Sequence, residues 1–135
     1  EHFQIALRLK PDYAEAHNNL GVVYKTRGLI DKAIEHYLLA IRLNPTSAEA
    51  HNNLGNAYRA KGLFDRAEEH LQNALRLKPD YADAYNNIGI VYSFKGLFDE
   101  AIKHFRTALG STLITQKHII ILELLMRERD CWIKQ

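Results

Sequence analysis

Seven histidines and one cysteine are the side chains of this 135-residue sequence that could hold a metal ion or perform acid–base or nucleophilic chemistry. The histidines are spaced regularly, mostly 34 residues apart, whereas a metal site needs several ligands that converge on one point. We therefore expect structural or surface roles for them, with no metal and no cofactor. The two regular series are His2, His36, His70 and His104, and His17 and His51.

Cys131 and His118 are the remaining candidates for a catalytic pair. A cysteine nucleophile needs a histidine base, a third group that orients the base, and donors that stabilise the oxyanion. Both residues lie in one short C-terminal segment that offers no such third group. We therefore predict that the chain has no active site and is not an enzyme.

The 34-residue spacing extends to the rarer residues and defines a tandem repeat. Residues 14–47 and 48–81 share 19 identities in 34 aligned positions, and residues 48–81 and 82–115 share 15. The expected organisation is a single array: 1–13, the second helix of a truncated repeat; 14–47, 48–81 and 82–115, three full repeats; and 116–135, a divergent C-terminal capping helix. The in-phase residues are Pro11, Pro45 and Pro79; Gly21, Gly55 and Gly89; and Gly28, Gly62 and Gly96.

Each repeat is predicted to contain two helices. Apolar residues at three- and four-residue spacing mark the first helix, and Gly28 can adopt the left-handed conformation that ends it. Asp31 and its equivalents Asp65 and Asp99 are expected to cap the second helix, which should end before Pro45. Neither helix buries its apolar face alone. We therefore predict an all-α fold, a right-handed α-solenoid of stacked antiparallel helix pairs.

The composition argues against a nucleic-acid partner and against a membrane-spanning segment. The net charge of +2 comes from 18 basic and 16 acidic residues spread along the chain, so we expect no nucleic-acid partner. The longest apolar stretch, 119–126, is interrupted by Glu123 and is too short to span a bilayer. One cysteine and no signal-peptide pattern favour a cytoplasmic location. Because the sequence opens at Glu1, we expect it to be a piece of a longer protein.

These features resemble the tetratricopeptide repeat family over residues 1–115. The residues that carry the resemblance are Leu20-Gly21, Tyr24, Ala33, Tyr37, Ala40 and Pro45; Leu54-Gly55, Tyr58, Ala67, Leu71, Ala74 and Pro79; and Tyr85, Ile88-Gly89, Tyr92, Ala101, Phe105 and Ala108. The resemblance implies a scaffold for protein–protein interaction, whose concave groove, lined by the first helix of each repeat, binds a peptide or another partner segment.

The groove is expected to carry an acidic edge, a ladder of asparagines and a basic edge. An asparagine amide both donates and accepts, so the ladder can bond a peptide backbone, although the amides could instead bond neighbouring backbone. The expected binding residues are Glu15, Asn18, Asn19, Lys25, Glu49, Asn52, Asn53, Asn56, Arg59, Asp83, Asn86 and Asn87. Val22, Thr26, Ala60, Ile90, Ser93 and Phe94 are expected on the same side.

Two templates within the family give more specific expectations. Carrying over the co-chaperone clamp for a chaperone C-terminus gives Asn18, Val22, Asn53, Asp83 and Asn87, of which only Asn53 fits, so that function is disfavoured. The asparagine ladder of O-linked N-acetylglucosamine transferases is similar at Asn19, Asn53 and Asn87. The alternative function is therefore the substrate-recognition region of a larger enzyme such as a glycosyltransferase.

The C-terminal segment departs from the repeat pattern. We predict a helix from about Gln116 to Arg129 that turns Ile119, Leu122 and Met126 toward the third repeat. Its other apolar residues either pack on that repeat, or mediate self-association through the exposed face or by insertion into the groove of a neighbouring molecule. Self-association would make the chain a homo-oligomerisation module. These residues are Ile120, Ile121, Leu124 and Leu125.

Overall fold

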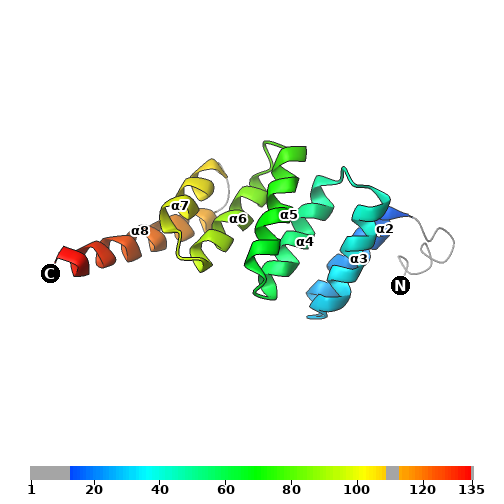
Figure 1. The fold of residues 1–135 in the computed structure, drawn as a ribbon, viewed down its shortest axis with the longest axis horizontal. Helices are drawn as coiled ribbons and strands as arrows, with labels where there is room; N and C mark the ends of the chain where they lie inside the picture. Colours follow the sequence, from blue (N-terminus) through cyan, green and yellow to red (C-terminus); the bar gives the residue numbers. More distant parts are fainter. Residues whose placement is uncertain (1–12, 109–112, 135) are drawn as a thin grey trace. The chain divides into compact units, whose positions relative to one another are not determined.

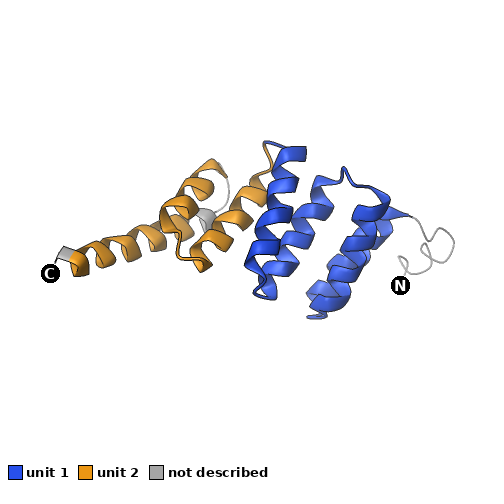
Figure 2. Cartoon of the chain, in the orientation of Figure 1, with its two compact units in different colours: residues 1–79 blue, residues 80–135 orange. Residues whose placement is uncertain are grey.

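The computed structural model describes residues 13–108 and 113–134, so residues 1–12 of the helix expected at 1–13 lie outside the described residues. The described residues form α-helices joined by short turns, with no β-strand among them. The chain divides into two compact units, residues 1–79 and residues 80–135 (Figure 2).

The first unit contains two helical hairpins. They are formed by α2 (Ala14–Thr26) with α3 (Ile30–Leu43), and by α4 (Ala48–Ala60) with α5 (Phe64–Leu77) (Figure 1). α3 also packs on α4, and α2 touches α4 directly. Buried apolar side chains from all four helices fill the space between them. They include Ala16, Leu20, Ala33, Tyr37, Ala40, Ala50, Leu54, Ala57, Ala67, Leu71 and Ala74.

The second unit contains one further hairpin and a longer helix. α6 (Ala82–Phe94) packs on α7 (Phe98–Thr107), and α7 packs on α8 (Leu113–Lys134). Ile88, Val91 and Phe105 are fully buried between α6 and α7. The expected all-α fold of paired helices is thus confirmed.

The turn inside each hairpin closes on a glycine, as the sequence predicts. Gly28, Gly62 and Gly96 have φ angles of 80°, 80° and 79°. In the first turn the amide of Gly28 donates to the Lys25 carbonyl at 2.9 Å, and the Leu29 amide donates to the Tyr24 carbonyl at 2.8 Å. This pair of bonds is a Schellman motif, which satisfies the last carbonyls of the helix.

The expected aspartate caps are wrong. Asp31, Asp65 and Asp99 lie inside the first turn of α3, α5 and α7, and the N-cap positions are occupied by leucines that make no side-chain capping bond. The physical reason is the short turn, in which the residue that completes the Schellman motif is already the residue that begins the next helix. The aspartates instead place negative charge near the positive end of the helix dipole.

Close packing explains the second glycine series, as expected. A methyl group added at Gly21 would lie 2.6 Å from Cε1 of Tyr37, and one added at Gly55 would lie 2.6 Å from Cγ of Leu71. Both distances are well inside van der Waals contact. Glycine therefore sets how closely the two helices of a repeat approach each other.

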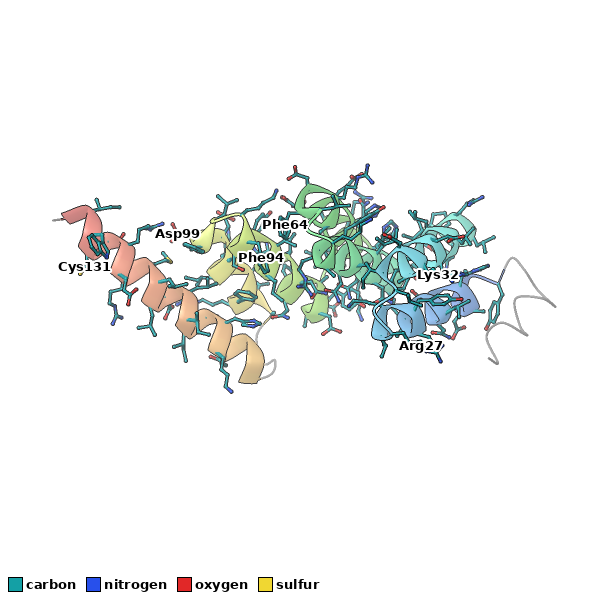
Figure 3. All side chains as sticks on the ribbon, turned by 90° about the horizontal axis from the view of Figure 1, so that it is seen from below. Arg27, Lys32, Phe64, Phe94, Asp99 and Cys131 are labelled. Atoms are coloured by element: carbon teal, nitrogen blue, oxygen red, sulfur yellow. The ribbon has the colours of Figure 1, made fainter. Side chains whose placement is uncertain are left out.

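The C-terminal helix is longer than predicted. α8 begins three residues before Gln116 and continues five residues past Arg129. Ile119 and Leu122 are buried, as expected, and Met126 is half-buried. The C-terminal turns of α8, marked by Cys131 in Figure 3, extend beyond α7.

Candidate functional site

The side of α2 and α4 that carries the expected groove residues of the first two repeats is here called the α2/α4 face. Its residues are Glu15, Asn18, Asn19, Lys25, Glu49, Asn52, Asn53, Asn56 and Arg59. Hydrogen bonds between some of these side chains join the two helices. The Asn18 amide donates to Oε1 of Glu49 at 3.3 Å, and the Asn53 amide donates to Oδ1 of Asn18 at 3.0 Å. Asn18 and Asn53 thus bond side chain to side chain across two repeats.

The structure separates the asparagines into two groups. Asn18 and Asn52 were expected to face a partner, but each residue is only 6% exposed. Asn18 lies between α2 and α4, where it bonds Glu49 and Asn53. Asn19 and Asn53 are half-buried at the edge of that contact. The Asn19 side chain makes no hydrogen bond within the described residues, so its amide keeps both its donor and its acceptor for a ligand.

The basic end of the α2/α4 face is formed by Lys25 and Arg59. Burial lowers the pKa of Lys25, and the positive charge of Arg59 lowers it further. Burial also lowers the pKa of Arg59, whose Nε donates to Oδ1 of Asn56 at 3.1 Å. Two partly desolvated cations that repel each other favour the approach of an anion.

The acidic end lies at the first turns of the same helices. The Tyr13 hydroxyl donates to Oε2 of Glu15 at 3.0 Å. Glu15 and Glu49 border a cavity of about 200 Å³. Carboxylates on the wall of a cavity favour a basic ligand group. The cavity is lined by Ala14, Glu15, Asn18, Ala40, Asn44, Ser47 and Glu49.

The expected groove residues of the third repeat lie on α6, which belongs to the second unit. On α6, Asp83 is exposed and Asn86 and Asn87 are half-buried, while Phe94 is 64% exposed. These residues belong to α6, whereas the α2/α4 face belongs to the first unit, so bands that run over all three repeats stay a prediction.

The histidines of the two series meet in pairs, which the sequence analysis did not foresee. Nδ1 of His17 lies 3.2 Å from Nδ1 of His36, and Nδ1 of His51 lies 3.3 Å from Nδ1 of His70. In each pair one ring nitrogen donates and the other accepts. Burial lowers the pKa of His36, His51 and His70. The sequence does carry a sign of this pairing, because the two histidines of each pair are 19 residues apart.

Each histidine pair is bordered by a tyrosine of the first helix. The Tyr24 and His36 rings have centroids 5.3 Å apart, and those of Tyr58 and His70 are 5.6 Å apart. The rings therefore belong to the packing between the two helices of a repeat. Within the described residues, no three His, Cys, Asp or Glu side chains come together as a metal site.

The structure also shows where Cys131 and His118, the candidates for a catalytic pair, lie. Cys131 is exposed, and His118 packs on Phe105 with ring centroids 5.3 Å apart. Thirteen residues of helix separate the two, about 20 Å at 1.5 Å per residue, so they form no reactive pair. None of the described helices is long and apolar enough to cross a membrane.

Comparison with known proteins identifies the repeat. A family model described as tetratricopeptide repeat matches residues 46–111, and one described as TPR repeat matches residues 1–28 and 23–62. The crystal structure of MamA is 30% identical with a TM-score of 0.83, over 98% of this chain and 79% of that one. The chain belongs to the tetratricopeptide repeat family.

Two further structures share the tetratricopeptide fold. The first TPR domain of Spaghetti (RPAP3), bound to the HSP90 peptide SRMEEVD, has a TM-score of 0.81 at 21% identity, over 84% of this chain and 93% of that one. Pseudomonas aeruginosa PilF has a TM-score of 0.85 at 24% identity, over 93% and 59%. No curated protein matches the sequence. Tetratricopeptide repeats are protein-interaction modules, and this chain is accordingly a protein-interaction scaffold.

Proposed function

We propose that this scaffold is not an enzyme and that it binds an extended peptide along the α2/α4 face. The supporting observation is the opposite charge of the two ends of that face. Glu15 and Glu49 lie at one end, and Lys25 and Arg59 at the other. A face that carries both charges suits a protein segment better than the uniformly negative backbone of a nucleic acid.

The spacing of the two ends defines the ligand. Ten residues separate Glu15 from Lys25, and ten separate Glu49 from Arg59, which is about 15 Å along a helix. An extended peptide advances about 3.3 Å per residue, so four to five residues cover this distance. The proposed ligand therefore carries a basic group and an acidic group about four to five residues apart.

Each part of the face has a role in this proposal. The cavity beside Glu15 and Glu49 receives the basic side chain, and the two cations receive the carboxylate. Between them, the free amide of Asn19 bonds the peptide backbone. The tetratricopeptide domain of RPAP3 was solved with the peptide SRMEEVD, so a domain of this fold accommodates a short peptide.

The test is a series of fluorescein-labelled peptides with one lysine and one glutamate in a glycine–serine–alanine background. The two charged residues are separated by two to eight positions, in both orders, and affinity is measured by fluorescence anisotropy. We expect the tightest binding at a separation of about four to five residues in one of the two orders, and weaker binding at higher salt.

Charge-reversed variants locate the binding site. Lys25→Glu and Arg59→Glu are expected to weaken the best peptide by about tenfold or more, because a carboxylate would then face another carboxylate. Lys32→Glu on α3 is the matched control, since Lys32 lies over the Tyr24 ring at 5.5 Å and not on the α2/α4 face (Figure 3). Affinity that ignores charge spacing, or that falls equally in the control, would contradict the proposal.

A further inference from the structure

One face of α8 is apolar, and none of the described residues covers it. α8 packs on α7 through Ile119 and Leu122, which are buried. Four further apolar side chains in the middle of α8 are about half exposed, at 55%, 53%, 50% and 45%. Neighbouring exposed apolar residues on one helix mark an interaction surface. These residues are Ile120, Ile121, Leu124 and Leu125.

The centre line of this face has the spacing of a coiled-coil seam. Lys117, Ile121, Leu124 and Glu128 follow one another at intervals of four, three and four residues. Ile120 and Leu125 widen the apolar strip on its two sides. The strip thus has an apolar centre, with a positive residue toward the N-terminus and a negative residue toward the C-terminus.

This pattern is complementary to itself when the direction of the helix is reversed. Two antiparallel copies of α8, related by a two-fold axis between positions 122 and 123, place Ile121 opposite Leu124 of the second copy. The same axis places Lys117 opposite Glu128 at both ends. A parallel pair would instead place lysine opposite lysine and glutamate opposite glutamate, which is unfavourable.

The two charged residues are available for this contact. Lys117 and Glu128 are exposed, and neither has an ion-pair partner among the described residues. By contrast, Glu123 is paired with Arg106 of α7, and Arg129 lies 3.5 Å from Asp130. Lys117 and Glu128 are therefore available charges at the two ends of the apolar strip.

We propose that the occupant of this face is a second copy of the chain, bound through an antiparallel two-fold pair of α8 helices. A two-fold contact uses the same surface on both copies, as this charge pattern requires. The apolar part is short, so the pair belongs to the weak class of interfaces, with dissociation in roughly the micromolar to millimolar range. The peptide-binding face on α2 and α4 is not involved.

Sedimentation equilibrium across that concentration range tests the proposal. The wild type should show a monomer–dimer equilibrium, and Leu124→Glu should abolish the dimer because it places a carboxylate in the apolar centre. Leu38→Glu is the matched control, since Leu38 is 42% exposed on α3, a helix of the other compact unit. Circular dichroism confirms that every variant keeps its helix content.

Charge exchange tests the antiparallel arrangement. Lys117→Glu alone and Glu128→Lys alone should each weaken the dimer by about tenfold, and the double exchange should restore it. An equimolar mixture of the two single variants should dimerise more tightly than either alone. A wild type that is monomeric at every concentration overturns the proposal, as does a loss of association in Leu38→Glu equal to that in Leu124→Glu. Single exchanges without effect overturn the antiparallel pairing.

Discussion

The hydrogen bond between Asn53 and Asn18 allows a test of whether the asparagines hold the fold or the ligand. Asn53→Ala removes the donor at 3.0 Å from Oδ1 of Asn18, a residue that is only 6% exposed. The amide nitrogen of Asn18 keeps its bond to Glu49, but the oxygen loses its partner in a nearly dry interface. A buried acceptor left without a donor costs about 1–3 kcal/mol.

The expected change in melting temperature follows from the chain length. An unfolding entropy of about 2.1 cal/mol/K per residue gives about 0.28 kcal/mol/K for 135 residues. A loss of about 1–3 kcal/mol in the free energy of unfolding therefore lowers the melting temperature by about 4–11 °C. Thermal unfolding followed by far-ultraviolet circular dichroism measures this change.

Asn19→Ala is the matched control, because Asn19 is half-buried on the same face and its side chain makes no hydrogen bond within the described residues. Alanine has the higher helix propensity, so the melting temperature should stay constant or rise slightly. Under the proposed function, however, Asn19→Ala should weaken binding of the best peptide. The reasoning is refuted if Asn53→Ala melts like the wild type while Asn19→Ala is destabilised.

The double variant isolates the interaction itself. If Asn18 and Asn53 are coupled as the 3.0 Å distance indicates, Asn18→Ala combined with Asn53→Ala should cost less than the sum of the two single changes. Additive losses would mean that the two amides act independently and that the bond contributes nothing to stability.

Three further predictions concern the hairpins. Gly55→Ala should cost about 1–3 kcal/mol in urea unfolding, because the added methyl group would lie 2.6 Å from Cγ of Leu71; an unchanged midpoint would contradict the close packing. Gly62→Ala should lower the free energy of unfolding by about 1–2 kcal/mol because its φ of 80° strains alanine. No atom lies within 4 Å of the new methyl group, so a steric clash is not the cause. Gly62→Asn should lower the free energy of unfolding by less, since asparagine tolerates this conformation better. Burial lowers the pKa of His51 and His70 below the unfolded value near 6.5, so the unfolded state binds more protons and stability should fall as pH drops through and below about 6.5. Melting curves from pH 8 to pH 5 check this, and a transition unaffected by pH in that range would show that the pair does not resist protonation.

Most of the fold could be predicted from the sequence because the repeat is local. A 34-residue period with apolar residues at helical spacing dictates two helices, and each stacks only on its neighbours. Gly28 at the turn and Gly21 at the helix contact were assigned correctly for the same reason. The aspartate caps failed because cap selection depends on turn length to a single residue, and the Schellman motif already occupies that position.

The sequence by itself determined the repeat, the hairpins, the tetratricopeptide family and the composition of the α2/α4 face, because all of these follow from spacing along one chain. Only the tertiary structure decided which polar groups are paired with each other and which remain for a ligand. Asn18 and Asn19 are adjacent and of one type, yet one is buried in a hydrogen-bond network and the other is free. That difference arises from the approach of α4 to α2, a contact between residues more than 30 positions apart.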